Sequence, residues 1–246
     1  MLLSLCVVAA CASDTDDETP EATDEAAQVA EHWSHEHPEE WGEECATGDR
    51  QSPVDLTDAE PSDLQDIVFD YQPSAVTVAN TGHTIQAAYG SGSAIGVDGT
   101  WFDLVQFHFH APSEHTIDGK HAAAELHLVH QDDDGNLAVI GVLVEKGRPN
   151  KGVAPVLDDA PRREGMDAEP GAKIDADDLL PESLLTYRYD GSLTTPPCSE
   201  GVQWLVMAEP VTWSPAQLTA FTDLYDGSNR PVQPLGERVQ VVDTTD

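Results

Sequence analysis

Two histidines separated by a single residue lie in the segment QFHFH at residues 106–110. Successive side chains of a β-strand point to opposite faces, so His108 and His110 would share one face with Gln106. Residues two apart in a strand have backbones about 6.5–7 Å apart, which is close enough for both imidazole rings to bind one metal ion. The opposite face of this strand would carry Val105, Phe107 and Phe109.

A second alternating segment offers a third nitrogen ligand. In residues 125–129, Glu125, His127 and Val129 would share a face. If this strand is a neighbour of the first, His127 completes a set of three imidazoles, and three nitrogens with an open fourth position are typical of catalytic zinc. Because neutral imidazoles leave the charge of Zn²⁺ uncompensated, a water molecule bound to it would ionise in neutral solution. The alternative is that these histidines have only a structural role.

Two polar residues are in phase with the three histidines. Gln106 and Glu125 could each accept a hydrogen bond from the second ring nitrogen of a ligand histidine. Such a bond fixes which ring nitrogen faces the metal ion and how the ring is oriented. We therefore expect Gln106 and Glu125 to support the ligands from behind.

The elements that must position these residues are mostly strands. The acidic run 132–136, which contains Gly135, predicts the turn of a hairpin, with a calcium-binding loop as the alternative. Ser214 followed by Pro215 predicts the start of a helix that ends at Gly227. We expect a mostly β fold with short peripheral helices. The predicted strands cover residues 76–78, 104–110, 123–130, 137–144, 202–208 and 238–242.

The 246 residues carry a large excess of acidic groups, with 46 Asp plus Glu against 11 Lys plus Arg and a net charge of −35. This charge argues against binding to nucleic acid or to an anionic lipid surface, because both need clustered Lys and Arg. Repulsion among the charges destabilises the compact state at low salt, whereas about 1 M salt screens charges beyond about 3 Å. The composition therefore favours adaptation to high salt, and the alternative is a very soluble secreted protein.

The first residues resemble an export signal. Residues 1–11 contain a short apolar stretch and end in Val-Ala-Ala-Cys, which is similar to a bacterial lipobox with Cys11 as the lipidated residue. The usual basic start of a signal is missing, because no Lys or Arg precedes Arg50. The acidic residues 12–30 predict a solvated tether, which leaves a single domain at 31–246. We expect an extracytoplasmic protein, periplasmic or on the cell surface, whose contact with a membrane is confined to a lipid anchor.

Cysteine usage agrees with export. If Cys6 and Cys11 belong to the signal, Cys45 and Cys198 remain. An even pair in an exported chain favours a disulfide. Two independent buried thiols are the alternative.

The chain resembles the α-class carbonic anhydrases in an ordered series of motifs between about residues 33 and 242. The resemblance implies one domain built on a twisted, mainly antiparallel central sheet of about ten strands, with zinc at the bottom of a conical cleft. It also implies a disulfide between Cys45 and Cys198, where bacterial and secreted members carry theirs. The motifs are QSPVDL (51–56), NTGH (80–83), QFHFH (106–110), SEHT (113–116), AAELHLVH (123–130), LAVIGVLVEKG (137–147), LLPESL (179–184), GSLTTPPC (191–198) and RPVQPL (230–235).

The same resemblance implies the metal site and its gatekeeper. The residues that match the zinc ligands are His108, His110 and His127. Thr194 matches the gatekeeper, whose hydroxyl group donates a hydrogen bond to Glu114 and accepts one from the zinc-bound hydroxide, so that the hydroxide is aimed at carbon. The residues that match supporting positions are Gln106, Glu125 and the buried His115.

Substrate and proton would use different parts of the cleft. The resemblance implies an apolar pocket for uncharged CO₂, in which the Thr194 backbone N–H would bind a bicarbonate oxygen. His83 matches the proton shuttle, because an imidazole that titrates near neutral pH can relay a proton to bulk water. The alternatives are plain core packing for the pocket residues and a loop histidine without a role for His83. The pocket residues are Val129, Val139, Leu193, Thr194, Thr195, Val202 and Trp204.

The chain departs from the family pattern at two positions. His35 stands where members usually have a tyrosine that joins the proton-relay water network, so we expect it either to disturb that network or to act as a second relay. Ala111 follows the second ligand where many animal members have tryptophan, which predicts a wider cleft. The Pro196–Pro197 bond carries the family's expectation of a cis peptide.

The function that we expect is reversible hydration of CO₂ to bicarbonate and a proton, with Zn²⁺ as cofactor. CO₂ or bicarbonate would be the small-molecule partner of a monomer or homodimer. One alternative is a catalytically silent, carbonic-anhydrase-like binding domain, although silent members lose a ligand histidine and this chain has all three. The other alternative is a zinc hydrolase that attacks esters slowly as a side activity.

Overall fold

A computed structural model describes residues 33–244 of the chain. The predicted signal segment 1–11 with Cys6 and Cys11, and the predicted tether 12–30, lie outside the described residues. Within the described residues, no helix combines the length and the apolar character that crossing a membrane requires.

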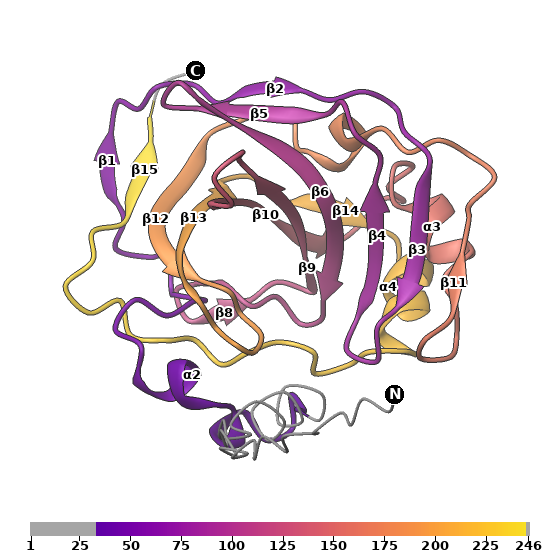
Figure 1. Cartoon of the computed structure of the whole chain (residues 1–246), viewed down its shortest axis with the longest axis horizontal. Helices are drawn as coiled ribbons and strands as arrows, with labels where there is room; N and C mark the ends of the chain where they lie inside the picture. Colours follow the sequence, from indigo (N-terminus) through magenta and orange to yellow (C-terminus); the bar gives the residue numbers. More distant parts are fainter. Residues whose placement is uncertain (1–32, 245–246) are drawn as a thin grey trace, which may run out of the picture. The chain divides into compact units, whose positions relative to one another are not determined.

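The mostly β prediction is confirmed by one large sheet of 13 strands among the described residues, whose central strands are strongly curved (Figure 1). A path of ten hydrogen-bonded neighbours crosses it. Most neighbours are antiparallel, and the parallel pairs are β10–β13, β10–β14 and β1–β15. In path order the ten strands are β1 (Glu60–Ser62), β15 (Val241–Asp243), β12 (Thr186–Ser192), β13 (Glu200–Met207), β10 (Leu137–Lys146), β9 (Ala124–Gln131), β6 (Thr100–His110), β4 (Ile85–Tyr89), β3 (Val76–Asn80) and β11 (Asp167–Ala168).

The remaining strands lie beside this path. One strand pairs with β10, and a short ribbon of two strands pairs with the first half of β6. A separate two-stranded sheet follows the segment that contains Glu114. These strands are β14 (Val211–Trp213) on β10, β2 (Val68–Asp70) and β5 (Ala94–Val97) beside β6, and β7 (Thr116–Ile117) paired with β8 (Lys120–His121).

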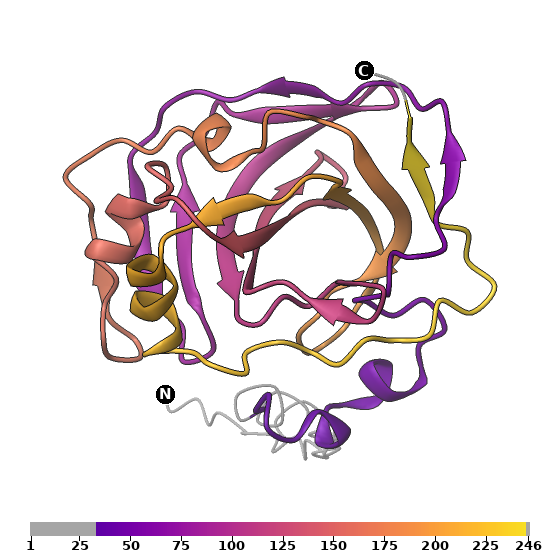
Figure 2. The ribbon, with the colours of Figure 1, turned by 180° about the vertical axis from the view of Figure 1, so that it is seen from behind.

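Short helices surround the sheet, as predicted. The best capped is α4 (Pro215–Thr222), where the Ser214 side chain accepts from the Gln217 backbone N–H and the Gln217 side chain bonds back to Ser214. This helix begins where predicted but ends at Thr222, five residues before Gly227. Helices α3 and α4 lie side by side in both views (Figure 2). The other helices are η1 (Pro38–Glu40), α2 (Glu43–Thr47), α3 (Ala154–Asp158) and η2 (Ala176–Leu179).

Apolar side chains pack on both faces of the central strands. The larger cluster contains Phe107 and Phe109 of β6, and Trp213 and Phe221 pack against Phe109. The smaller cluster, on β10, β12 and β13, includes Trp204. Burial of these side chains on both faces is the main force that holds the central strands in register.

The prediction that Val105 shares a face with Phe107 and Phe109 is wrong. The pairing of β6 with β9 shifts by one residue between Leu104 and Gln106, so Val105 is the extra residue of a β-bulge and is 45% exposed. Leu104 packs with Phe107 and Phe109 in its place. The bulge lies before Gln106, so the alternation from Gln106 to His110 is unchanged.

The acidic run forms the predicted turn between β9 and β10. The carboxylate of Asp132 accepts hydrogen bonds from the backbone N–H groups of Asp134 and Asn136 and from the Asn136 side chain, and Gly135 has a φ of 87°. The Asp132 oxygens therefore stabilise the turn itself. The last predicted strand, 238–242, is shorter than expected, because β15 begins only at Val241.

Candidate metal centre

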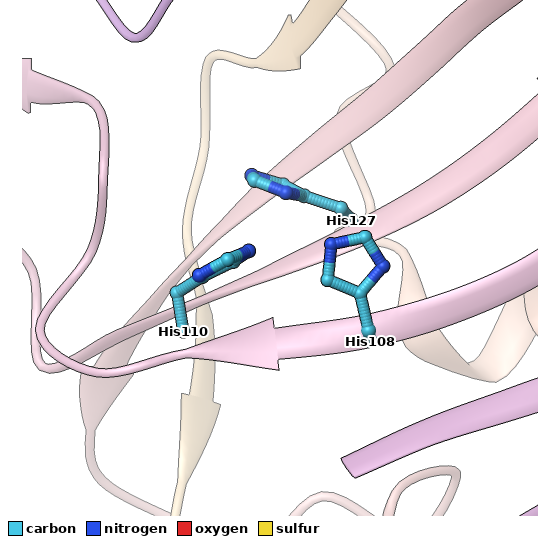
Figure 3. A group of neighbouring side chains, drawn as sticks. All are labelled: His108, His110 and His127. Carbon is cyan, nitrogen blue, oxygen red and sulfur yellow. The ribbon is translucent and has the colours of Figure 1, made fainter. Parts of the chain in front are cut away.

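His108 and His127 come from neighbouring antiparallel strands. In the pairing of β6 with β9, His108 lies directly opposite His127, and their ring centroids are 5.2 Å apart. His110, two residues along β6, has its ring centroid 5.1 Å from that of His108 and 4.7 Å from that of His127. Figure 3 shows the three rings turned toward a common space. One ligand nitrogen from each ring lies within 4.8 Å of the other two.

Each of the three rings is held through one nitrogen by an acceptor behind it. His108 Nδ1 lies 2.9 Å from Gln106 Oε1, and His127 Nε2 lies 2.9 Å from Glu125 Oε1. His110 Nδ1 lies 2.6 Å from the backbone oxygen of Ser228. These acceptors require a proton on the nitrogen that they contact, which leaves the opposite nitrogen of each neutral ring as a free lone pair.

The donor set fits Zn²⁺. His110 Nε2 is fully buried and has no hydrogen-bond partner among the described residues, which is costly for a polar atom unless something occupies the space. Burial lowers the pKa of all three histidines, most strongly that of His108, so the rings are neutral and able to bind a metal. Three neutral nitrogens with space for a fourth ligand match a catalytic zinc site.

Glu125 joins His127 to a buried network. Its Oε1 also lies 2.7 Å from His115 Nδ1, and its Oε2 accepts from the backbone N–H groups of Glu114 and His115 at 2.8 Å. Burial raises the pKa of Glu125, but the attraction and hydrogen bonds of His115 and His127 outweigh it and hold the pKa well below its usual range. Gly141, opposite His127 on β10, leaves room for this carboxylate, since a Cβ there would lie 3.1 Å from Oε1.

His115 is buried and continues the network on its other side. Its Nε2 lies 2.7 Å from the hydroxyl group of Tyr189, which in turn donates to Ser52 Oγ at 2.9 Å. Burial raises the pKa of Tyr189 well above its usual range, so the hydroxyl keeps its proton. Both nitrogens of His115 are therefore used inside the protein, and its ring supports Glu125.

Glu114 is completely buried beside the three histidines. Its Oε1 accepts a hydrogen bond of 2.8 Å from the backbone N–H of Arg230 and lies 3.6 Å from His110 Nδ1. Burial raises the pKa of Glu114 to about 7, although His127, the Arg230 N–H and the Thr194 hydroxyl group each counteract the rise. Its Oε2 has no hydrogen-bond partner among the described residues, and the Thr194 hydroxyl group is near enough to lower the pKa of this carboxyl group.

A cavity of about 210 Å³ opens above the three histidines. Predicted pocket residues form its apolar wall, and Thr194 and Thr195 lie beside them. Val202 is the exception: it is buried in the smaller cluster but does not line the cavity. Ala111 is also buried, in the larger cluster, and does not line the cavity. The predicted pocket residues that line the cavity are Val129, Val139, Leu193, Thr194, Thr195 and Trp204.

His83 lines the same cavity at the turn after β3. Its ring is stacked on Trp33, with centroids 3.7 Å apart and planes 11° apart. His35 lies between this pair and the metal centre, with its ring centroid 6.3 Å from those of His83 and His110. Burial, followed by repulsion from His110, lowers the pKa of His35 to about 3, so this ring is neutral.

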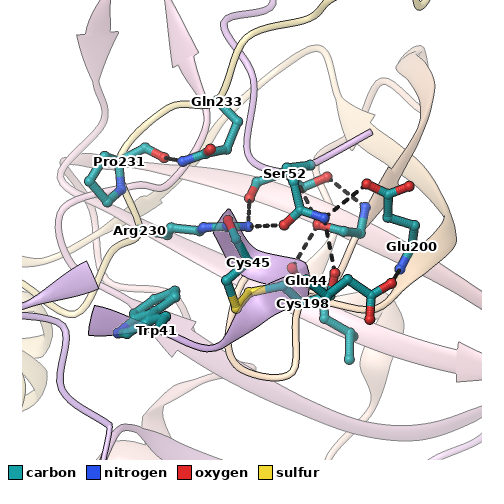
Figure 4. Close-up of a disulfide and its surroundings, with 12 residues drawn as sticks. Trp41, Glu44, Cys45, Ser52, Cys198, Glu200, Arg230, Pro231 and Gln233 are labelled. Carbon is teal, nitrogen blue, oxygen red and sulfur yellow. Dashed lines mark hydrogen bonds between the residues drawn. A yellow bond between two sulfur atoms is a disulfide. The ribbon is translucent and has the colours of Figure 1, made fainter. Parts of the chain in front are cut away.

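The predicted disulfide between Cys45 and Cys198 is present (Figure 4). It joins residues 153 apart in sequence. It lies at the end of the loop that carries Thr194 and Thr195, and the Cys198 N–H donates to the Thr195 backbone oxygen at 2.9 Å. The Pro196–Pro197 bond in this loop is cis, as expected. The buried guanidinium of Arg230 donates to the Cys45 backbone oxygen, and its own backbone N–H reaches Glu114.

Several partners of the site were not identified in the sequence. Ser228 and Arg230 act on His110 and Glu114 through backbone groups, which any residue type could supply. Tyr189 contacts His115 and donates to Ser52, which lies 137 residues away from it in sequence. Trp33, Thr81, Thr84 and Gln86 also line the cavity. Gln86 pairs with His108, and its position between the apolar Ile85 and Ala87 was the signal available in the sequence.

Comparisons with known proteins agree with this geometry. Residues 30–243 match the family model described as eukaryotic-type carbonic anhydrase. A carbonic anhydrase from a Nostoc species is 42% identical over 216 residues, covering 83% of this chain and 82% of that protein. One from Klebsiella pneumoniae is 42% identical, covering 86% and 91%. The α-carbonic anhydrase of Thermovibrio ammonificans, solved with the inhibitor sulfanilamide, superposes with a TM-score of 0.82 at 44% identity, covering 87% of this chain and 99% of that one.

Proposed function

The chain belongs to the eukaryotic-type carbonic anhydrase family, and we propose that it is a zinc enzyme that hydrates CO₂ reversibly to bicarbonate and a proton. The observation that carries this proposal is the set of three converging, neutral imidazoles at the base of the cavity. We assign His108, His110 and His127 as the ligands. Zinc bound there would supply a Lewis acid that allows a water molecule to lose its proton near neutral pH.

We assign to Gln106, Glu125 and the Ser228 carbonyl the task of orienting the three rings. Each acceptor holds the far nitrogen of one ring, so the other nitrogen points at the same space. This pre-arrangement avoids the cost of ordering three side chains when metal binds. His115 supports it indirectly, because it holds Glu125 between two histidines.

Thr194 and Glu114 orient the attacking solvent molecule in this proposal. With Glu114 ionised, its carboxylate can only accept, so the Thr194 hydroxyl must donate to it. The Thr194 oxygen then has only lone pairs to offer the cavity, and it accepts a hydrogen bond from the solvent nucleophile. This arrangement turns the nucleophile's lone pair toward carbon and selects against ligands that have no proton to donate.

Carbon dioxide binds against the apolar wall in this proposal. Val129, Val139 and Leu193 provide a surface without charge, with the edge of Trp204 beside it. An uncharged, linear substrate needs no cation for recognition, and a charged product is held poorly by such a surface. Thr194 lines the same cavity, and we assign to its backbone N–H the binding of a substrate oxygen.

His83 carries the released proton to solvent. It lines the cavity and is half-buried against Trp33, and a neutral imidazole can accept a proton relayed through water and pass it on to buffer. His35 is too strongly held in its neutral form to act as a second relay. We assign to it a hydrogen bond to cavity water, because its buried Nε2 has no partner among the described residues.

We further propose an extracytoplasmic enzyme adapted to high salt, with residues 1–11 as a lipoprotein signal, residues 12–30 as a tether and 31–246 as the catalytic domain. The net charge of −35 and the disulfide support this view. Urea unfolding measured from 0.1 to 3 M NaCl tests the salt adaptation. Stability should rise most steeply below about 1 M, where screening changes most, and a flat curve would contradict it.

Zinc analysis and stopped-flow CO₂ hydration of His127→Ala test the central proposal. We expect loss of both bound zinc and activity, whereas His37→Ala, which removes an exposed histidine, should retain both. A chelator should abolish wild-type activity, and added zinc should restore it. Bound zinc without CO₂ hydration would favour the silent binding domain. An ester assay on the same samples identifies a hydrolase, and activity retained by His127→Ala would refute the ligand assignment.

A further inference from the structure

The turn that carries His83 is hydrogen-bonded to residues 161–166, a segment distant in sequence. The backbone N–H of Asn80 donates to the Met166 oxygen at 3.0 Å, and the N–H of Gly165 donates back to the Asn80 oxygen at 2.9 Å. The Asn80 side chain donates to the Pro161 oxygen at 2.8 Å, and the Tyr225 hydroxyl group bonds to its other end. Residues 161–166 are thereby fixed against the end of β3.

These hydrogen bonds place the carboxyl group of Glu164 against Gly82, the residue before His83. Gly82 has a φ of 89°, and a Cβ at this position would lie only 2.8 Å from the carboxyl carbon and Oε1 of Glu164. The backbone conformation therefore favours glycine, and the carboxyl group of Glu164 fills the space beside it. The Glu164 carboxylate is exposed to solvent on its outer side, while its inner side lies against the turn.

Few ionisable groups face the His83 ring. Trp33 covers one face of the ring, and His35 approaches from the same N-terminal segment but is neutral. Tyr225, beside Gly82, keeps its proton because burial raises its pKa. Burial lowers the pKa of His83, and the charge of Glu164 opposes that effect. Arg162 and Arg163 also lie in residues 161–166, so the test must separate the effect of their charges on His83 from that of Glu164.

We propose that Glu164 is a positioning residue for His83, whose carboxylate over Gly82 attracts the protonated ring and stabilises it at the cavity wall. The inference rests on the proposed role of His83 as proton acceptor. A proton that leaves the cavity passes to a ring nitrogen of His83 and then to buffer. Burial alone would make the ring a poor proton acceptor. The Glu164 carboxylate offsets this effect of burial, and the half-buried ring can still pass the proton to solvent.

The first test measures the proton affinity of His83 by NMR titration of the metal-loaded enzyme, with the ring signals assigned by their loss in His83→Asn. In Glu164→Gln at low ionic strength we expect the proton affinity to fall by about 1.4- to 5-fold, the range for an exposed charge pair. Glu164→Asp should restore part of it. Because salt screens exposed charges, the difference between wild type and Glu164→Gln should shrink in 2 M NaCl.

Two matched controls make the result specific. Glu169→Gln removes an equal charge near the opposite end of β3, where Glu169 lies with Ala75 and Tyr89, and it should leave the His83 titration unchanged. Arg163→Gln reports the effect of the neighbouring cation, which should be opposite in sign if present. An unchanged titration in Glu164→Gln, or an equal change in Glu169→Gln, would overturn the inference.

The catalytic consequence is measured separately by ¹⁸O exchange between CO₂ and water. In Glu164→Gln the pH at which His83-dependent proton transfer is half-maximal should move down with the NMR titration, without a change in the rate of CO₂–bicarbonate interconversion. If His83→Asn leaves proton transfer unchanged, the shuttle assignment fails, and the catalytic part of this inference fails with it. A changed NMR titration would still establish the electrostatic interaction between Glu164 and His83.

Discussion

His108 and His127 lie directly opposite each other on β6 and β9, with their ring centroids 5.2 Å apart. This register brings together two proposed ligands that are 19 residues apart in sequence, and the alternation of β6 then adds His110. A shift of one residue in this pairing would turn one of the two rings to the opposite face of the sheet. The metal centre therefore depends on the same packing that holds the sheet in register.

Gln106→Leu should weaken zinc binding without unfolding the protein. The variant removes the acceptor 2.9 Å from His108 Nδ1, so the ring is no longer fixed in the orientation that ligation needs. We expect the zinc dissociation constant, measured by competition with a chelator, to rise about 10- to 100-fold. Gln131→Leu, at the exposed end of β9, should bind zinc like the wild type. Equal affinity in both variants would contradict the role of Gln106.

Thr194→Val should reduce kcat/KM for CO₂ hydration by about 10²-fold while zinc content stays unchanged. Valine has nearly the same shape but can neither donate to Glu114 nor accept from the solvent nucleophile. Inhibition by monovalent anions that have no proton should become stronger, because the selection against them is lost. Thr77→Val, on the exposed side of β3, serves as the matched control. Wild-type kinetics in Thr194→Val would remove the threonine from the mechanism.

Replacing Cys45 and Cys198 together with serine should lower the free energy of unfolding by about 4–5 kcal/mol in the chain-entropy account. The disulfide closes a loop of about 153 residues, so its loss releases much conformational freedom in the unfolded chain. Urea unfolding at fixed high salt measures the change. The wild type in reducing buffer should behave like the double variant. A loss below about 1 kcal/mol would mean that the unfolded chain gains little freedom.

His130 should make the protein less stable as the pH falls below about 6.5. Burial lowers its pKa to about 3 in the folded protein, where Nε2 lies 2.9 Å from the Tyr71 hydroxyl group. Between pH 6.5 and 3 the unfolded chain therefore binds one proton more, and His130 lowers the free energy of unfolding by about 1.4 kcal/mol per pH unit.

The pH dependence of His130→Gln isolates this contribution. Glutamine can still bond to Tyr71 but does not titrate, so unfolding measured from pH 7 to pH 4 should show a shallower slope than in the wild type. Parallel slopes in the wild type and His130→Gln would mean that His130 is protonated in the folded protein.

Much of the fold and the candidate site followed from local patterns. Alternation in 106–110 and 125–129 placed the histidines on matching faces because a strand has a strict period of two. The same reasoning failed at Val105, since a bulge depends on how two strands fit together and leaves no mark in a run of apolar residues. The end of α4 was also misjudged, because Gly227 follows a non-helical turn.

The sequence by itself determined the ligand types, their spacing and the residues in phase behind them, since these depend only on side-chain chemistry and strand geometry. Only the tertiary structure decided which groups from distant segments complete the site. The Ser228 carbonyl that orients His110, the Arg230 N–H that reaches Glu114 and the Glu164 carboxylate on Gly82 all come from distant segments. Backbone groups are the same in every residue, and the packing of loops on a sheet arises from many weak contacts. No local sequence pattern therefore predicts which distant groups reach the site.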